Sequence, residues 1–236
     1  MVNCVVRFRK THPKIGTRKL KHLLAQAGYN CGRDFLFDLL KQRGLLIARK
    51  RSHTRTTNSN HPYKRYKNLT STLHITAPNQ LWVADITYMR TTSSYWYLSL
   101  ITDAYSRKIV GYCVSPTLSH HGPLLALKRA IKKRSLNDRQ PLIHHSDRGC
   151  QYCCHAYTAE LAKHNITISM TETSSPYDNA LAERMNGILK HEYGLNQIFP
   201  DHKTLIEAVN KAVDSYNNKR PHSALDMKTP HQIHGI

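Results

Sequence analysis

Long apolar segments are absent from this sequence. No apolar run among its 236 residues approaches the roughly 18 residues that a membrane-spanning helix needs. The first ten residues, MVNCVVRFRK, also lack the apolar stretch and the small-residue cleavage site of an export signal. We therefore expect a cytoplasmic protein with no membrane partner, and its hydrophobic share of 40% is typical of a globular chain.

Acidic residues are scarce. The chain has 15 Asp and Glu against 35 Lys and Arg, which gives a formal net charge of +20. Most of this imbalance falls in residues 1–75, where 17 basic residues face 2 acidic ones. An excess of this size indicates binding to nucleic acid, although charge alone does not distinguish DNA from RNA or from an anionic membrane surface.

Cysteines are few, and their spacing is irregular. In a chain without an export signal we expect the six thiols to stay reduced. Cys150, Cys153, Cys154 and His155 form a compact cluster that suggests zinc. A structural zinc site needs a closed set of four ligands, commonly two separated pairs, and the other three cysteines offer no second pair. We therefore interpret these thiols as packing residues.

Two short amphipathic helices are predicted near the N-terminus. In TRKLKHLLAQAGYN, apolar residues recur at helical spacing from Leu20 to Ala27. Thr17 is the expected N-cap of this helix, and Gly28 is expected just past its end. A second helix follows in GRDFLFDLLKQRG, with an expected apolar face made of Phe35, Leu36, Leu39 and Leu40.

We interpret residues 1–48 as a small all-α helix-turn-helix domain, because two short helices joined by a few residues containing Gly are typical of that motif. The second helix of such a motif can lie in the major groove of DNA. Arg33, Lys41 and Arg43 on its polar face are then expected to contact DNA. A plain helical hairpin within a basic domain is the alternative.

Residues 49–74 are predicted to form a basic linker. They show almost no apolar periodicity and are rich in basic, Ser, Thr and Asn residues. Lys64 and Arg65 lie between Tyr63 and Tyr66, an arrangement that could follow a nucleic-acid backbone while the rings stack on bases. A solvated linker without that role is the alternative.

Residues 75–236 are predicted to form one α/β domain. LWVADITYM, YWYLSLIT and KIVGYCVS are strand-like runs separated by short turns, and they predict an antiparallel meander. A helix near 122–134, the strand PLIHH, a helix near 155–164, the strand ITIS and helices near 178–192 and 203–217 complete the order. A meander followed by alternating helices and strands indicates a mixed sheet flanked by helices.

Three carboxylates are expected at one edge of this sheet. Asp85 lies within the first strand, and Asp147 lies just past the fourth in HHSDRGCQY. Glu183 belongs to a polar stripe of the helix DNALAERMNGILKHE, nearly opposite its apolar face. A gap of 35 residues separates Asp147 from Glu183, which is enough for a helix, a strand and a return.

Such a group of carboxylates would suit a hard cation. Oxygen ligands of this kind favour Mg²⁺ or Mn²⁺, which keep water ligands and accept phosphate oxygens. Two such ions roughly 4 Å apart can activate a water or a 3′ hydroxyl and stabilise the leaving oxygen of a phosphodiester. The wet side of an ordinary amphipathic helix is the plainer explanation for Glu183 when that helix is considered alone.

At this point the sequence resembles the DDE transposases of the IS-three (IS3) family of bacterial insertion sequences, which are relatives of retroviral integrases. The pieces that carry the resemblance are WVADITYM, YLSLITDAYSRKIVGY, HHSDRGCQY, DNALAERMNGILKHE and YNNKRPHSAL, together with the N-terminal IGTRKLKHLLAQAGYN. The chain resembles the product of the downstream reading frame. An upstream-frame protein is therefore a candidate partner, because members commonly gain a heptad repeat and a second DNA-binding segment from that frame.

The resemblance implies an RNase H-like fold for residues 75–236. It implies that Asp85, Asp147 and Glu183 bind Mg²⁺ or Mn²⁺, as two ions, and act in catalysis. Lys190 would contact the terminal DNA of the element. Arg148 and Asn179 would contact phosphate or orient a carboxylate, whereas Asp103 and Asp178 are interpreted as supporting or structural residues.

The resemblance also implies an activity and its partners. The activity is cleavage at the ends of an insertion sequence, followed by attack of the freed 3′ hydroxyl on another phosphodiester. The partners are double-stranded DNA, as terminal inverted repeats and as target, and further copies of the chain on that DNA in the bacterial nucleoid. Two alternatives are a DNA-binding regulator of transposition without catalysis and a structure-selective RNase H-like nuclease.

Overall fold

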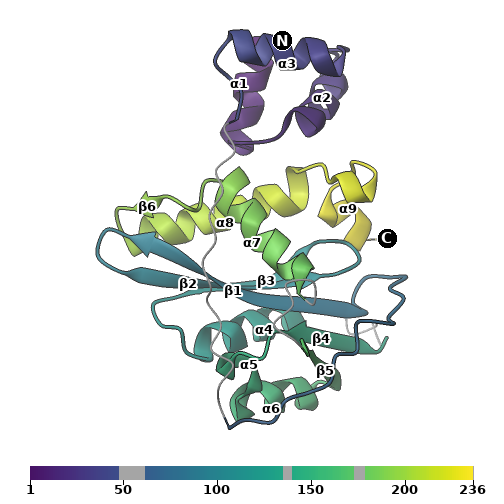
Figure 1. Ribbon diagram of the computed structural model, residues 1–236, viewed down its shortest axis with the longest axis vertical. Coiled ribbons are helices and arrows are strands. Elements are labelled where there is room, and N and C mark those ends of the chain that lie inside the picture. Colours follow the sequence, from purple (N-terminus) through teal and green to yellow (C-terminus); the bar gives the residue numbers. More distant parts are fainter. Residues whose placement is uncertain (48–61, 135–139, 173–178, 236) are drawn as a thin grey trace.

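The computed structural model describes residues 1–47, 62–134, 140–172 and 179–235 (Figure 1). The centre is a mixed sheet with the strand order β3-β2-β1-β4-β5, to which β6 adds by pairing with β1. The strands are β1 (Leu81–Thr91), β2 (Tyr95–Asp103), β3 (Ile109–Ser115), β4 (Leu142–Ser146), β5 (Ile166–Met170) and β6 (Ile198–Phe199). The predicted mixed sheet is therefore confirmed.

Strand pairing follows the predicted order. β1, β2 and β3 form an antiparallel meander, while β4 lies parallel to both β1 and β5. Short turns allow the antiparallel neighbours, whereas the parallel neighbours need the helical crossovers that the sequence supplies. Because β1 and β4 are neighbours, residues at the end of β4 lie beside the middle of β1.

Helices cover both faces of the sheet (Figure 1). On one face, α4 and α6 bury the cluster around Trp82, Leu127 and Tyr157. On the other, α7 and α8 bury the cluster around Met89 and Leu189. The helices of this part are α4 (His121–Lys133), α5 (Cys150–Cys153), α6 (His155–Lys163), α7 (Ala180–Glu192), α8 (His202–Lys219), η1 (Ser223–Leu225) and α9 (Pro230–His234).

One glycine lets a helix approach the sheet closely. A Cβ atom at Gly111 of β3 would collide with the carbonyl oxygen of Ala126 and the Cβ of Ala130, both on α4. The short helix α5, the two-residue strand β6 and the C-terminal η1 and α9 are additions to the predicted order. They are too short to give a periodic signal in sequence.

The N-terminal region contains three helices, α1 (Val2–Thr11), α2 (Thr17–Gln26) and α3 (Arg33–Gln42), around a small core of their own. The sequence pattern predicts α2 and α3 but not α1, whose apolar residues alternate with basic ones. The expected cap of α2 is wrong, because Gly16 is the N-cap and Thr17 is the first helical residue. Gly28 has φ +85° just past the helix, as predicted.

The predicted apolar face of α3 is wrong at Phe35. Its side chain is 59% exposed, while Leu36 and Leu40 are buried. Leu36 and Leu40 are four residues apart and share one face of the helix, whereas Phe35 is rotated from Leu36 by about 100°. The core of the three-helix region is closed on the Leu36 side, so Phe35 and the neighbouring Phe37 face outward.

A buried ion cluster joins the N-terminal helices to the rest of the chain. Glu192, at the end of α7, accepts hydrogen bonds from Arg220 at 2.7 and 3.0 Å and from Lys19 of α2 at 3.3 Å. His12 pairs with the hydroxyl of Tyr193 at 3.1 Å. Burial opposes the charge of Glu192, but Arg220 and Lys19 outweigh it, and the pKa of Glu192 is lowered.

The described part of the predicted linker lies along β5. The backbone N–H of Leu69 donates to Ser169 Oγ at 2.9 Å, and that of Met170 donates to the carbonyl of Lys67 at 3.3 Å. Residue 48 of the predicted helix-turn-helix domain, residues 49–61 of the predicted linker and Asp178 lie outside the described residues. Among the described residues, no helix has both the length and the apolarity to cross a membrane.

Candidate active site

Asp85 and Asp147 line the same small cavity, of about 20 Å³, at the edge of the sheet. The parallel pairing of β1 with β4 brings them together, since Asp147 directly follows the last residue of β4. The other lining residues are Ile86, Tyr88, Leu118, Gln151 and Tyr152. The cavity has room for about one water-sized group.

The carboxyl group of Asp85 lies in an unfavourable environment for a negative charge. Burial and the neighbouring charge of Asp147 raise its pKa to about 7. Two hydrogen bonds oppose this shift, one from the N–H of Ile86 at 2.9 Å and one from the side-chain amide of Asn186 at 2.7 Å. They do not compensate fully, so ionising both carboxylates is costly unless a cation enters.

Asp147 begins a tight turn that leads into α5. The N–H of Gly149 donates to Asp147 Oδ1 at 3.0 Å, and α5 starts at the next residue. A Cβ at Gly149 would lie 3.0 Å from that oxygen and 2.9 Å from Gln151 Oε1, so a side chain there would disturb the turn. The turn places Gln151 and Tyr152 against the cavity.

Helix α7 brings Glu183 toward this region without placing it in the cavity. Asn179, its N-cap residue, is buried and donates from its amide to the carbonyl of Ala84 at 3.1 Å, next to Asp85. Glu183 lies in the first turn, is exposed, and its charge also raises the pKa of Asp85. No three His, Cys, Asp or Glu side chains within the described ranges are grouped closely enough to hold a metal ion.

The donors present nevertheless fit a divalent cation. Asp85 and Asp147 offer carboxylate oxygens that repel one another, and the predicted third ligand, Glu183, is one helical turn from Asn186, which bonds Asp85. Tyr152 Oη and Asn186 Oδ1 are buried without a hydrogen-bond partner among the described residues. Hard oxygen donors and excess negative charge suit Mg²⁺ or Mn²⁺.

Comparison with known proteins gives the family. A model described as "Integrase core domain" matches residues 75–176, and a second with the same description matches residues 164–230. The insertion element IS600 uncharacterized 31 kDa protein of Shigella sonnei is 37% identical, over 95% of this chain and 82% of the relative. Transposase InsF for insertion sequence IS3A of Escherichia coli is 30% identical, over 96% and 78%. The chain belongs to the IS3 family of insertion-sequence transposases.

Solved structures agree with the RNase H-like fold that the resemblance implies. The HTLV-2 integrase catalytic core domain, determined in complex with magnesium, matches with a TM-score of 0.54 at 23% identity, covering 67% of this chain and 97% of that one. A simian T-cell lymphotropic virus intasome chain matches with a TM-score of 0.58 at 20% identity, over 92% and 70%. At these identities the matches speak for the fold alone.

Within this IS3-family fold, Lys190 is near enough to Asp85 for the charge of that carboxylate to act on its ammonium group. It sits on α7 two turns after Glu183 and is half-buried. Burial lowers the pKa of its ammonium group, and the charge of Asp85 opposes that shift. Arg148 directly follows Asp147 and is also half-buried. Asn179 is committed to the carbonyl of Ala84, which favours an orienting role over a phosphate contact.

The expected DNA-contact residues of the N-terminal region lie on exposed surfaces. Arg33 forms an ion pair with Asp34 at 2.8 Å, which offsets its charge, whereas Lys41 and Arg43 are exposed at the end of α3. Lys64 lies over the ring of Tyr66 at 5.2 Å. Arg65 is exposed beside it.

The three cysteines that follow Asp147 do not line the cavity. Cys153 is buried and donates to Met170 Sδ at 3.5 Å, and burial raises its pKa to about 11. A thiol that stays protonated is a poor zinc ligand. Sequence reasoning did not single out Tyr88, Gln151 or Tyr152, although the last two belong to HHSDRGCQY and follow Asp147 within five residues.

Proposed function

We propose that this IS3-family chain is a DNA transposase. It binds the terminal inverted repeats of its element and catalyses metal-dependent strand cleavage, followed by attack of the freed 3′ hydroxyl on a target phosphodiester. The single observation that carries the proposal is the shared cavity of Asp85 and Asp147, where burial and mutual repulsion raise the pKa of Asp85.

The residues of the chain divide the work of this reaction. Asp85 and Asp147 hold the cation from two neighbouring strands, and Glu183 completes the ligand set from α7. A bound Mg²⁺ or Mn²⁺, in one or two copies, supplies activation of the attacking hydroxyl and stabilisation of the leaving oxygen. Lys190 and Arg148 bring positive charge to the DNA phosphates, and Asn186 orients the carboxylate of Asp85.

The helix-turn-helix domain, residues 1–48, recognises the element ends through Arg33, Lys41 and Arg43. Residues 49–74 form the basic linker between this domain and the rest of the chain. Lys64 and Arg65 within that connection follow the DNA backbone. Joining two ends requires at least two copies of the chain on DNA, and an upstream-frame protein is a further partner. By analogy only, the magnesium complex of the HTLV-2 core supports a divalent cation, and the simian virus intasome supports an assembly on DNA.

The test is a cleavage and strand-transfer assay on the repeats that flank the source gene. Glu183→Gln should abolish both reactions while DNA binding persists. Asp214→Asn is the matched control, because it removes one carboxylate charge from an exposed ion pair with Lys219. Undiminished activity of Glu183→Gln would refute the role of that residue.

The second candidate is a DNA-binding regulator that occupies element ends without catalysis. The net charge of +20 favours binding whether or not chemistry follows. Binding of the wild-type chain without turnover at any concentration of Mg²⁺ or Mn²⁺ would favour the regulator. Cutting of branched DNA or RNA–DNA hybrid without preference for one terminal sequence would favour the structure-selective nuclease instead.

A further inference from the structure

Tyr152 has an unused hydroxyl close enough to Asp85 and Asp147 for their charges to act on it. The residue is 2% exposed, and its Oη is buried without a hydrogen-bond partner among the described residues. It lines the cavity together with both carboxylates. A buried hydroxyl is normally paired, so an unpaired one at the rim of a reactive site calls for a ligand.

The ring of Tyr152 is held firmly in this position. It lies edge-to-face with Tyr157, with centroids 5.3 Å apart at 83°, within the hydrophobic cluster between the sheet and α6. Tyr157 is equally buried, but its hydroxyl is satisfied by His144 Nε2 at 2.9 Å. Two neighbouring tyrosine rings in one cluster therefore differ in hydrogen bonding: the hydroxyl of Tyr157 is paired within the fold, and that of Tyr152 has no partner among the described residues.

We propose that Tyr152 is a further phosphate-binding residue of the active site, whose hydroxyl donates a hydrogen bond to a non-bridging oxygen of the scissile phosphodiester. This inference rests on the proposed function. A tyrosine hydroxyl, with an ordinary pKa of about 10, is protonated at neutral pH and can donate. A hydroxyl that donates needs an acceptor. An anionic phosphate oxygen accepts a stronger, charge-assisted hydrogen bond than a neutral oxygen does.

The decisive comparison is Tyr152→Phe against Tyr157→Phe, assayed for strand cleavage and for strand transfer. Tyr152→Phe should lower kcat of both reactions by roughly 10- to 100-fold with little change in KM for DNA, since a preorganised donor acts on charge in the transition state. Tyr157→Phe should keep the wild-type rates. Loss of cleavage alone would overturn the proposal, because the hydroxyl would then hold the attacking water.

A sulfur substitution in the DNA separates a bond to phosphate from a structural role. Sulfur is a weak acceptor, so a phosphorothioate at the contacted position should slow the wild-type chain more than it slows Tyr152→Phe. Equal slowing of the two proteins by both phosphorothioate diastereomers would contradict the phosphate contact.

Thermal unfolding without DNA gives a readout that does not depend on activity. Tyr152→Phe should leave Tm unchanged or raise it, because it removes an unpaired buried hydroxyl, whereas Tyr157→Phe should lower Tm by breaking its bond to His144. A fall for Tyr152→Phe as large as that for Tyr157→Phe would overturn the proposal. An inactive wild-type chain would refute the proposed function and this role together, whereas a fully active Tyr152→Phe beside an active wild type would refute this role alone.

Discussion

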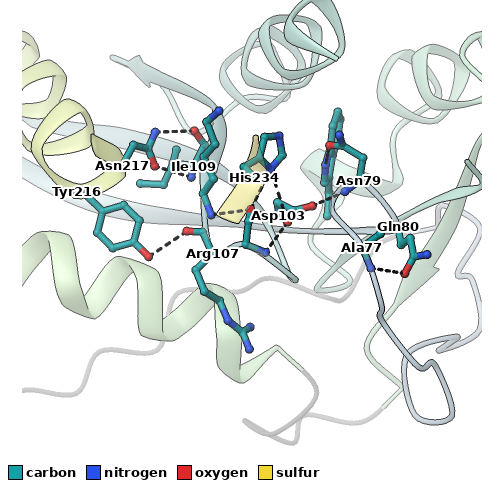
Figure 2. Close-up of polar contacts among 12 residues, drawn as sticks. Ala77, Asn79, Gln80, Asp103, Arg107, Ile109, Tyr216, Asn217 and His234 are labelled. Atoms are coloured by element: carbon teal, nitrogen blue, oxygen red, sulfur yellow. Dashed lines mark hydrogen bonds and ion pairs between the residues drawn. The ribbon is translucent and has the colours of Figure 1, made fainter. Parts of the chain in front are cut away.

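Two aspartates on adjacent strands have opposite environments. Asp103 at the end of β2 is fully buried, yet its carboxylate accepts hydrogen bonds from the N–H groups of Asn79 and Ser106 and from the Ser106 hydroxyl, each at 2.7 Å (Figure 2). Burial opposes its charge, but these bonds and His234 outweigh burial, and its pKa is lowered. Asp85 on β1 has two such bonds and a carboxylate neighbour, and its pKa is raised to about 7.

The difference shows how the chain separates structural from reactive charge. The groups that contact the Asp103 carboxylate come from three parts of the chain: the turn after β2, the segment before β1 and α9. This carboxylate therefore links those three parts through polar contacts (Figure 2). Glu192 is satisfied in a similar way, by Arg220 and Lys19. At the cavity, the two hydrogen bonds that Asp85 accepts do not offset its burial and the charge of Asp147, so its pKa stays raised.

The largest effect should come from the same substitution made at both aspartates. Asp85→Asn should reduce cleavage and strand transfer by roughly a thousand-fold or more, since it removes a proposed ligand of the catalytic cation, and it should not lower Tm in EDTA. Asp103→Asn should show the reverse: a loss of about 2 kcal/mol in the free energy of unfolding, with the rate per folded molecule retained. Rate assays and urea unfolding of both variants check this.

An Asp103→Asn protein that folds stably but fails to cleave DNA would contradict the division. It would mean that Asp103 contributes to the reaction. Asp103 lies in YLSLITDAYSRKIVGY, one of the segments that carry the family resemblance, which is consistent with such a role. Likewise, a large fall in Tm for Asp85→Asn in EDTA would contradict the comparison. It would show that the fold stabilises the negative charge of Asp85 instead of disfavouring it.

Glu192→Gln should cost the next largest amount, about 3 kcal/mol in the free energy of unfolding, because Arg220 is 2% exposed and would lose its counter-charge. Since Lys19 lies on α2, the substitution should also expose the connection between the N-terminal helices and α7 to protease. Urea unfolding and limited proteolysis measure the two effects. Asp214→Asn, at an exposed ion pair, should change neither; a comparable effect there would mean that burial is not the cause.

Sequence patterns predicted the parts of this comparison that depend on local order. β1, β2 and β3 were predictable because each is a run rich in β-branched and aromatic residues, and α7 because its apolar residues repeat with helical spacing. The meeting of Asp85 and Asp147 followed from the parallel neighbours β1 and β4. The three carboxylates were expected together from their places in the predicted sheet and helix, and their catalytic roles came from the family resemblance, but only two of them line the cavity.

The remaining features depend on contacts that are distant in sequence. The role of Asp103 is set partly by His234, which lies 131 positions later, so its pattern gave no indication of a satisfied carboxylate. Tyr152 and Tyr157 look alike in sequence, and only the position of His144 distinguishes them. The outward side of Phe35 depends on which face of α3 the two other N-terminal helices cover, and propensity does not contain that information.

Metal binding should distinguish the two aspartates by a smaller effect on stability. Mg²⁺ at about ten times its dissociation constant should stabilise the wild-type chain by about 1.4 kcal/mol, because it binds the folded state in preference to the unfolded one. The stabilisation should disappear in Asp85→Asn and persist in Asp103→Asn. Thermal unfolding across a Mg²⁺ titration checks this, with Ca²⁺ as a comparison ion. An undiminished shift in Asp85→Asn would place the metal elsewhere.

The smallest effect is the pH dependence of the Asp103 contribution. Its pKa is lowered in the folded chain, so its stabilising effect is complete above the ordinary aspartate pKa of about 3.9 and is lost as pH falls through the lower folded value. The difference in unfolding free energy between wild type and Asp103→Asn should therefore be constant from about pH 7 to 5 and shrink below about pH 4. Urea unfolding of both proteins at several pH values measures it. A difference that grew on acidification would mean that Asp103 is stabilised in its protonated form, and the contrast with Asp85 would be lost.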